Sequence, residues 1–95
     1  MAVFGYARVS TDTQDLTRQL KALVNAGVEP QNIVKDVGSG KDFNRIEYQK
    51  LVNQTLKSGD TLYITSIDRL GRDMKAIEQE YQTIVELRQC KLISI

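Results

Sequence analysis

A cation and a hydroxyl stand two residues apart where an apolar run near the amino terminus ends. The run M-A-V-F-G-Y-A-R-V-S ends with Arg8 and Ser10. If the run is a β-strand, side chains two residues apart lie on the same face. A guanidinium stays charged at any working pH and its fork of donors matches phosphate oxygens, while nearby positive charge stabilises the alkoxide form of a serine. The pair therefore predicts a serine that attacks a phosphate held by an arginine.

More charged and hydroxyl side chains follow two later apolar runs. Several guanidinium groups around one point repel one another unless an anion lies between them. Their common purpose is then a phosphate, above all one that gains charge in a transition state. The residues are Asp36, Ser39, Gly40, Lys41 and Arg45 after the second run, and Ser66, Asp68, Arg69 and Arg72 after the third.

The scaffold must bring these run ends together. Apolar runs at 2–9, 33–36, 61–66 and 91–95 predict strands, and apolar residues at helical spacing predict helices after T-D-T-Q at 11–14, from about 46 to 57 and from about 73 to 89. Alternation of this kind predicts a three-layer α/β fold, with a mainly parallel sheet of about four strands and helices on both faces. Ligands of such sheets bind outside the carboxyl ends of the strands, so we expect the polar residues to share one edge.

Each predicted helix has an apolar side that should face the sheet. Gly27 and Gly59 are expected to end the first two helices. Cys90 is expected to be a small buried apolar residue, and the four tyrosines are expected in or beside the core. The apolar sides are Leu16, Leu20, Leu23 and Val24; then Tyr48, Leu51, Val52 and Leu56; then Met74, Ile77, Tyr81, Ile84 and Leu87.

Composition narrows the function classes. The chain has 95 residues, which is enough for one domain, and it has no apolar run of about 18 residues that would span a membrane. A single cysteine excludes an internal disulfide, and with no export signal we expect a cytoplasmic protein. Without histidine or a cysteine cluster, we expect no metal site and no cofactor. A net charge of +1 gives no whole-surface argument for nucleic acid binding.

Structural explanations exist for each of these residues alone. Ser10 could cap a helix, Arg8 could bury its stem at a strand end, and D-R-L-G-R-D at 68–73 could be a solvated helix start. G-S-G-K, which ends at Lys41, is not a phosphate loop, because Lys35 stands where a glycine is needed and Asp42 follows the lysine. The joint placement of the arginines on one rim favours the chemical interpretation.

Three motifs together resemble the catalytic domain of serine site-specific recombinases of the resolvase/invertase type. They are Y-A-R-V-S-T-D-T-Q-D-L-T-R-Q-L at 6–20, D-V-G-S-G-K at 36–41 and S-I-D-R-L-G-R at 66–72, and they cover nearly the whole chain in the family's order. The resemblance implies a DNA strand transferase that forms a 5′-phosphoserine link, exchanges strands and rejoins them without ATP, metal or cofactor.

The resemblance also implies roles for matching positions. Ser10 matches the nucleophile, and Asp68 matches the acidic partner that orients an arginine or handles a proton on the leaving 3′ oxygen. Members of the family often have proline after the position of Arg45, whereas Ile46 and Glu47 follow here, so the geometry of this loop should differ. The catalytic set is Ser10, Arg8, Asp68, Arg69 and Arg72, and the phosphate-binding or supporting set is Arg45, Gln14, Gln19, Ser39 and Lys41.

In the family a long helix that supports dimer and tetramer contacts follows this domain, and a DNA-binding part comes later. We find neither in residues 1–95, and no helix-turn-helix or zinc-ligand pattern. We therefore expect a catalytic-domain fragment that binds DNA weakly by itself, with DNA and further copies of the full-length chain as partners and no membrane. The type of recombinase and its DNA site stay open.

Two other function classes remain as alternatives. A non-catalytic module for phosphate or nucleic acid would keep the arginines without needing Ser10 and Asp68. A phosphoacceptor signalling domain would need clustered acidic residues after the first strand and a phosphoacceptor aspartate on the third, where this chain instead has Arg8 and Ser10 after the first.

Overall fold

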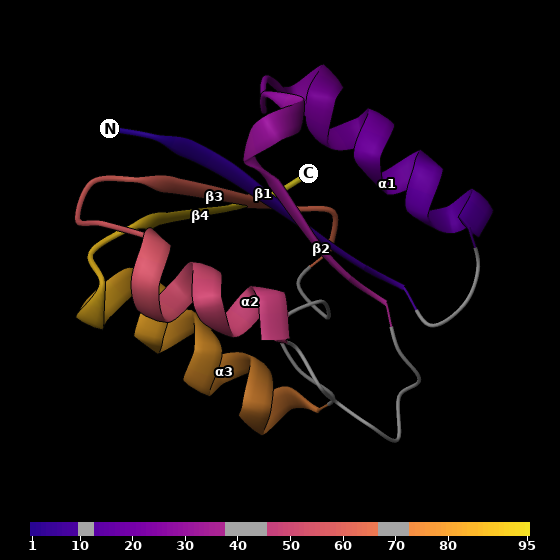
Figure 1. The fold of residues 1–95 in the computed structure, drawn as a ribbon. Coiled ribbons are helices and arrows are strands. Elements are labelled where there is room, and N and C mark those ends of the chain that lie inside the picture. Colours follow the sequence, from indigo (N-terminus) through magenta and orange to yellow (C-terminus); the bar gives the residue numbers. More distant parts are fainter. Residues whose placement is uncertain (10–12, 38–45, 67–72) are drawn as a thin grey trace.

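The computed structural model describes residues 1–9, 13–37, 46–66 and 73–95. Its four strands form one parallel sheet in the order β2-β1-β3-β4 (Figure 1). In chain order they are β1 (Val3–Val9), β2 (Ile33–Val37), β3 (Thr61–Ile64) and β4 (Lys91–Ser94). The predicted parallel α/β sheet is confirmed.

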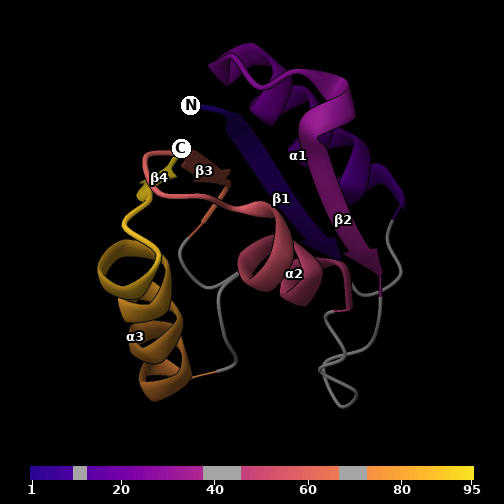
Figure 2. The same ribbon diagram turned by 60° about the vertical axis from the view of Figure 1, so that its left-hand side comes forward.

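Helices cover both faces of this sheet. Helix α1 (Thr13–Ala26) lies on one face, whereas α2 (Ile46–Lys50) and α3 (Met74–Gln82) lie on the other (Figures 1 and 2). Neighbouring residues of β1 point to opposite faces: Tyr6 packs in the apolar cluster under α2 and α3, and Ala7 packs in the cluster under α1. The predicted three layers are therefore confirmed.

Gly27 ends α1 as the sequence predicts. Its φ of +112° lies in the left-handed region that favours glycine. Its N–H donates to the carbonyl of Val24 at 3.0 Å, and the N–H of Val28 donates to the carbonyl of Leu23 at 3.1 Å. This pair of bonds is the Schellman arrangement. Leu23 of α1 and Val28 are both buried in the apolar cluster between α1 and the sheet, so the turn also completes the core on that face. A short 3₁₀ turn, η1 (Pro30–Asn32), then leads into β2.

The other two helices both end in wider, π-helical turns. α2 continues as η2 (Leu51–Thr55) and α3 continues as η4 (Thr83–Leu87). The N–H of Leu56 donates to Leu51 at 2.8 Å and that of Arg88 to Thr83 at 2.9 Å, which are bonds between residues five apart. The predicted lengths of these two helices hold only when these turns are included.

The apolar side predicted for α3 is wrong in part. Ile84 is buried and Ile77 packs against the core, but Met74, Tyr81 and Leu87 are 69%, 46% and 79% exposed. Only a narrow side of α3 faces the sheet, and at Leu87 the π-helical turn also departs from the spacing of an α-helix. On α1, Val24 is 43% exposed at the border of its apolar side. The apolar side predicted for the second helix is confirmed, since Tyr48, Leu51, Val52 and Leu56 are all buried, and so is Cys90.

Within the described ranges, no helix is long and apolar enough to cross a bilayer. The same residues contain no group of three acidic, cysteine or histidine side chains that could hold a metal ion.

Candidate active site

Two of the ten predicted site residues have described side chains, those of Arg8 and Gln19. For Gln14 the structure describes only the helical backbone, within α1. The other seven lie outside the described residues, and their positions stay predictions: Ser10, Ser39, Lys41, Arg45, Asp68, Arg69 and Arg72.

Arg8 lies at the carboxyl edge of the sheet, where the predicted site residues should meet. It is the last residue but one of β1, is half-buried, and faces Asp36 of β2 in the parallel register. β3 lies on the other side of β1. Helix α3 begins shortly after the predicted site residue Arg72 in sequence. The carboxylate of Asp73 accepts the N–H of Ala76 at 2.9 Å and so caps the helix. The helix start predicted at this aspartate is confirmed.

Arg8 and Gln19 are brought together, although they stand on different elements. The Nε2 group of Gln19 donates to the carbonyl oxygen of Arg8 at 3.2 Å, and the backbone N–H of Arg8 donates to Oε1 of Gln19 at 3.3 Å. Gln19 is buried, so its amide depends on these partners. Of the predicted set, this is the contact that the structure shows.

Asp36, which the sequence placed at this edge, forms a second polar centre whose partners the sequence did not predict. Its Oδ2 accepts the Tyr6 hydroxyl at 2.9 Å and the N–H of Tyr48 at 3.0 Å, and its Oδ1 accepts the N–H of Glu47 at 3.1 Å. The buried carboxylate thus caps α2 from the end of β2, although the two elements are separated in sequence. The start of α2, which directly follows Arg45 in sequence, is fixed to the strand beside Arg8.

Tyr48 extends this polar centre to α3. Its ring packs against that of Tyr6, with centroids 5.0 Å apart and planes at 55°. Its hydroxyl donates to Oε1 of Glu80 on α3 at 2.7 Å. The sequence predicted Tyr6 and Tyr48 only as core aromatics. Their polar partners come from other strands and helices, so no local spacing in the sequence indicated them.

A groove of about 620 Å³ opens beside this edge, between α1 and the residues that follow β3. Asp15, Gln19 and Thr65 are among the residues that line it. Asp15 also pairs with Arg18, whose side chain is largely exposed. The groove therefore runs along the α1 side of the Gln19 contact, while Gln19 itself stays buried.

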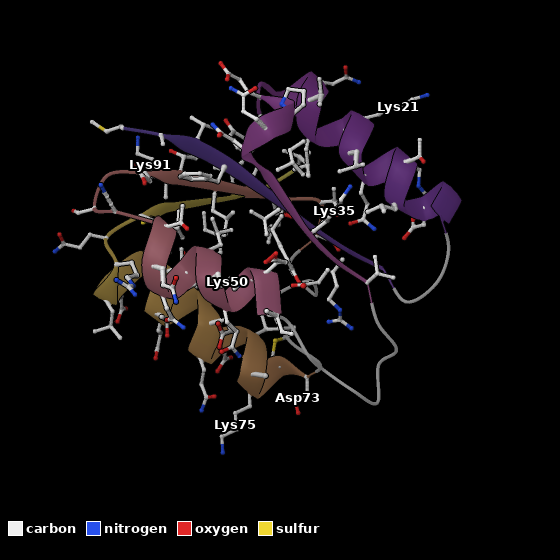
Figure 3. The ribbon with its side chains drawn as sticks, viewed as in Figure 1. Lys21, Lys35, Lys50, Asp73, Lys75 and Lys91 are labelled. Carbon is white, nitrogen blue, oxygen red and sulfur yellow. The ribbon has the colours of Figure 1, made fainter. Side chains whose placement is uncertain are left out.

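The labelled lysines do not gather around the site. Figure 3 shows them on separate elements and spread over the molecule. The labelled lysines therefore supply no concentrated positive field at the site, and such a field is expected from the predicted arginines and Lys41. The lysines are Lys21 on α1, Lys35 on β2, Lys50 on α2, Lys75 on α3 and Lys91 on β4.

Comparisons with known proteins agree with this fold. Residues 3–95 match the family described as "Resolvase, N terminal domain". The chain is 44% identical over 73 residues to the transposon Tn3 resolvase of Escherichia coli, and this match covers 77% of this chain and 39% of that protein. It is 36% identical over 85 residues to the transposon Tn917 resolvase of Enterococcus faecalis, covering 90% and 45%. It is 42% identical over 73 residues to a DNA-invertase of Enterobacteria phage P7, covering 77% and 38%.

The chain spans about two fifths of the length of these relatives. The family match nevertheless runs from β1 through β4 without leaving out a described strand or helix. The chain therefore belongs to the resolvase family, as a resolvase N-terminal domain.

Proposed function

We propose that this chain is the catalytic domain of a DNA site-specific recombinase and that Ser10 is its nucleophile. The observation that carries the proposal is the place of Arg8, at the carboxyl edge of a parallel sheet and two residues before Ser10. Family membership supports it, since the similar proteins are named resolvases, a site-specific recombinase and a DNA-invertase.

In the proposed reaction the Ser10 hydroxyl attacks a DNA phosphorus. A bond from phosphorus to Oγ forms as Oγ loses its proton, and the bond from phosphorus to the 3′ oxygen breaks. The leaving 3′ oxygen takes up one proton and becomes a hydroxyl, so the step conserves protons. One phosphate ester replaces another, so the step needs no ATP, and attack by the 3′ hydroxyl of an exchanged strand reverses it. The arginines stabilise the charge that develops on the phosphoryl oxygens. They are Arg8, Arg69, Arg72 and Arg45, with Asp68 as their acidic partner and Lys41, Gln14, Gln19 and Ser39 in support.

DNA is the proposed partner, and parts of the full-length protein outside these residues supply most of the affinity for it. With a net charge of +1 and the labelled lysines spread over the surface, this domain offers little of the counterion release on which non-specific DNA affinity depends. Base recognition and the assembly of several copies are proposed for the remainder of the longer protein, in accord with the greater length of its relatives.

The first test uses the full-length protein and a duplex with a nick beside the scissile phosphate, which traps the covalent intermediate. We expect Ser10→Ala to abolish the covalent protein–DNA adduct and to leave DNA affinity within about twofold, because the hydroxyl is needed for bond formation and not for binding. Ser94→Ala, on the exposed end of β4, is the matched control. An adduct that persists in Ser10→Ala overturns the role of Ser10. A wild-type protein that binds DNA without ever forming an adduct would instead be a phosphate-binding module.

The second test concerns Arg8. We expect Arg8→Lys to slow adduct formation about a hundredfold, because a point charge does not replace a planar donor fork at a charged transition state. Arg18→Lys, on the exposed side of α1, is the control and should react at the wild-type rate. Normal cleavage by Arg8→Lys would show that Arg8 does not hold the phosphate.

A further inference from the structure

Strands β1 and β3 stop pairing before β1 ends. Their last register pair is Tyr6 with Ile64, where β3 ends, whereas β1 continues to Val9 beside β2. Arg8 therefore lies two residues beyond the last pair with β3. A backbone N–H and carbonyl at such a position require other partners if they are shielded from water.

The side chain of Gln19 supplies these partners. Its amide accepts the N–H of Arg8 at 3.3 Å and donates to the carbonyl of Arg8 at 3.2 Å, which is the pair of bonds that a neighbouring strand would make. Oε1 also accepts the hydroxyl of Thr65 at 3.4 Å, in the residue that follows β3. The amide thus spans the two strands where their ladder has ended.

Asp15 completes the set of contacts. Its Oδ2 accepts the second N–H of the Gln19 amide at 2.9 Å, one helical turn earlier on α1. Both donors and both acceptor positions of the amide are then in use, in a side chain that is only 4% exposed. A reversed amide would place its oxygen against the carboxylate of Asp15 and N–H against N–H at Arg8. Asp15 therefore selects one orientation.

We infer that Gln19 takes the place of strand β3 at Arg8 and that Asp15 fixes the orientation of its amide, so that both are positioning residues for the guanidinium of Arg8. The inference rests on the proposed function, since it gives the two residues a part in the reaction. A guanidinium that must meet a phosphate within a fraction of an ångström needs a backbone that does not shift.

Gln19→Glu tests the donor of the amide through pH. The introduced carboxylate would face the carbonyl of Arg8 and the carboxylate of Asp15 with no proton to offer. Among the described residues the charged groups nearby are Asp15 and Arg18 on α1 and Arg8 on β1. Burial and the charge of Asp15 should raise the pKa of the introduced carboxyl. We expect adduct formation by the full-length variant to be slower by about tenfold or more at pH 8, and to approach the wild-type rate as the pH falls and the carboxyl gains a proton.

A second substitution moves the amide to the other residue. In Gln19→Glu combined with Asp15→Asn, the new amide can donate to the new carboxylate, so one of the lost bonds returns. We expect this double variant to react about threefold or more faster than Gln19→Glu alone at pH 8, although Asp15→Asn alone is slower than the wild type. Gln82→Glu, on the exposed side of α3, is the control for the added charge and should show the wild-type pH profile.

A measurement that does not need activity is hydrogen exchange of the Arg8 backbone N–H, followed by NMR on protein with nitrogen-labelled arginine and tyrosine. We expect slow exchange in the wild type and faster exchange in Gln19→Met, which fills the same space without an acceptor, with the protection of Tyr6 unchanged. If Gln19→Glu does not fold, Asp15→Ala takes its place, and we expect slower adduct formation together with faster exchange at Arg8.

The outcomes separate this inference from the proposed function. Wild-type rates in Gln19→Glu at every pH, or an equal slowing at every pH, would overturn the positioning role, as would an Arg8 amide that stays protected in Gln19→Met. Loss of that protection in a protein whose wild type forms no adduct would overturn the proposed function and keep the contact between Gln19 and Arg8. Three results together support the inference. Adduct formation by Gln19→Glu is slow at pH 8 and recovers in acid, Asp15→Asn speeds it in the double variant, and the Arg8 amide exchanges faster in Gln19→Met.

Discussion

Each edge of the sheet has a buried aspartate that accepts backbone N–H groups, and the two edges use it differently. At the amino edge, Oδ1 of Asp60 accepts the N–H of Ala2 at 2.8 Å and Oδ2 accepts that of Lys57 at 2.9 Å. At the carboxyl edge, Asp36 accepts N–H groups of Glu47 and Tyr48. Both carboxylates are nearly inaccessible to solvent.

The difference lies in what each carboxylate holds. Asp60 ties the first strand to the short turn before β3, and its own carbonyl accepts the N–H of Lys91 at 2.9 Å, so it joins three strand starts. Asp36 ties a strand end to the start of α2, directly after Arg45 in sequence. We therefore expect the amino edge to serve stability alone, and the carboxyl edge to serve stability and the proposed chemistry together.

The largest effect is expected for Asp36→Ala. It removes a buried acceptor from two backbone N–H groups and the Tyr6 hydroxyl, which should cost about 3 kcal/mol in the free energy of unfolding. Because α2 would lose its cap beside the site, adduct formation by the folded protein should also slow by tenfold or more, on the order expected for a displaced catalytic group. Urea unfolding and the nicked-duplex assay measure the two effects. A variant that is destabilised yet reacts at the wild-type rate would remove the distinction between the edges.

Asp60→Ala should have the next largest effect, and on stability only. Two partly buried N–H groups lose a charged acceptor, at a cost of about 2 kcal/mol. The folded fraction should form the adduct at the wild-type rate, since Asp60 lies at the edge away from Arg8. Glu78→Ala, on an exposed position of α3, is the control for loss of a carboxylate. Slower adduct formation in folded Asp60→Ala would show that the two edges are coupled.

Tyr48→Phe should be milder. It removes one partly buried hydrogen bond, from the Tyr48 hydroxyl to Glu80, and keeps the ring packing on Tyr6 and the backbone bond to Asp36. We expect a loss of about 1 kcal/mol. The matched variant Tyr81→Phe changes a tyrosine that is 46% exposed and should be near neutral. Equal losses in the two variants would mean that the bond to Glu80 adds nothing to the contact between α2 and α3.

The smallest expected effect is a change in acid stability. The backbone N–H groups of Ala2 and Lys57 lower the pKa of Asp60 from its ordinary value of 3.8. A lowered folded-state pKa means that this stabilisation is present above 3.8 and is lost as the pH falls below it towards the folded value. Asp60→Asn should therefore lose less stability than the wild type over that range. Identical acid unfolding curves, apart from a constant offset, would contradict this.

The sequence was sufficient for the fold because its signals are local. Alternation of apolar runs with helical spacing predicts the parallel sheet, and Gly27 predicts the end of α1 through a backbone angle that glycine adopts easily. The site could be predicted in residue types, since arginines and a serine follow the strand ends. The seven predicted residues outside the described ranges remain predictions.

What the sequence did not predict depends on contacts between distant residues. Tyr6 and Asp36 meet because β1 and β2 pair in one register, and no spacing within either strand indicates it. The predicted burial of Met74, Tyr81 and Leu87 on α3 was wrong. The neighbouring layers decide how much of a helix faces a sheet, and the apolar spacing of the helix does not. Gln19 was placed near the site through resemblance, but its partners at Arg8, Asp15 and Thr65 could be known only from the structure.

The π-helical turns at the ends of α2 and α3 bear on how proteins of this kind can diverge. A π-helical turn contains one more residue than an α-helical turn, over nearly the same rise along the helix axis. A deletion of one residue within 51–55 or 83–87 could then be absorbed by tightening that turn, with β3 and β4 left in place. Alignments with a one-residue gap in either stretch are thus compatible with an unchanged sheet, and lineages can differ in length there without disturbing the opposite edge.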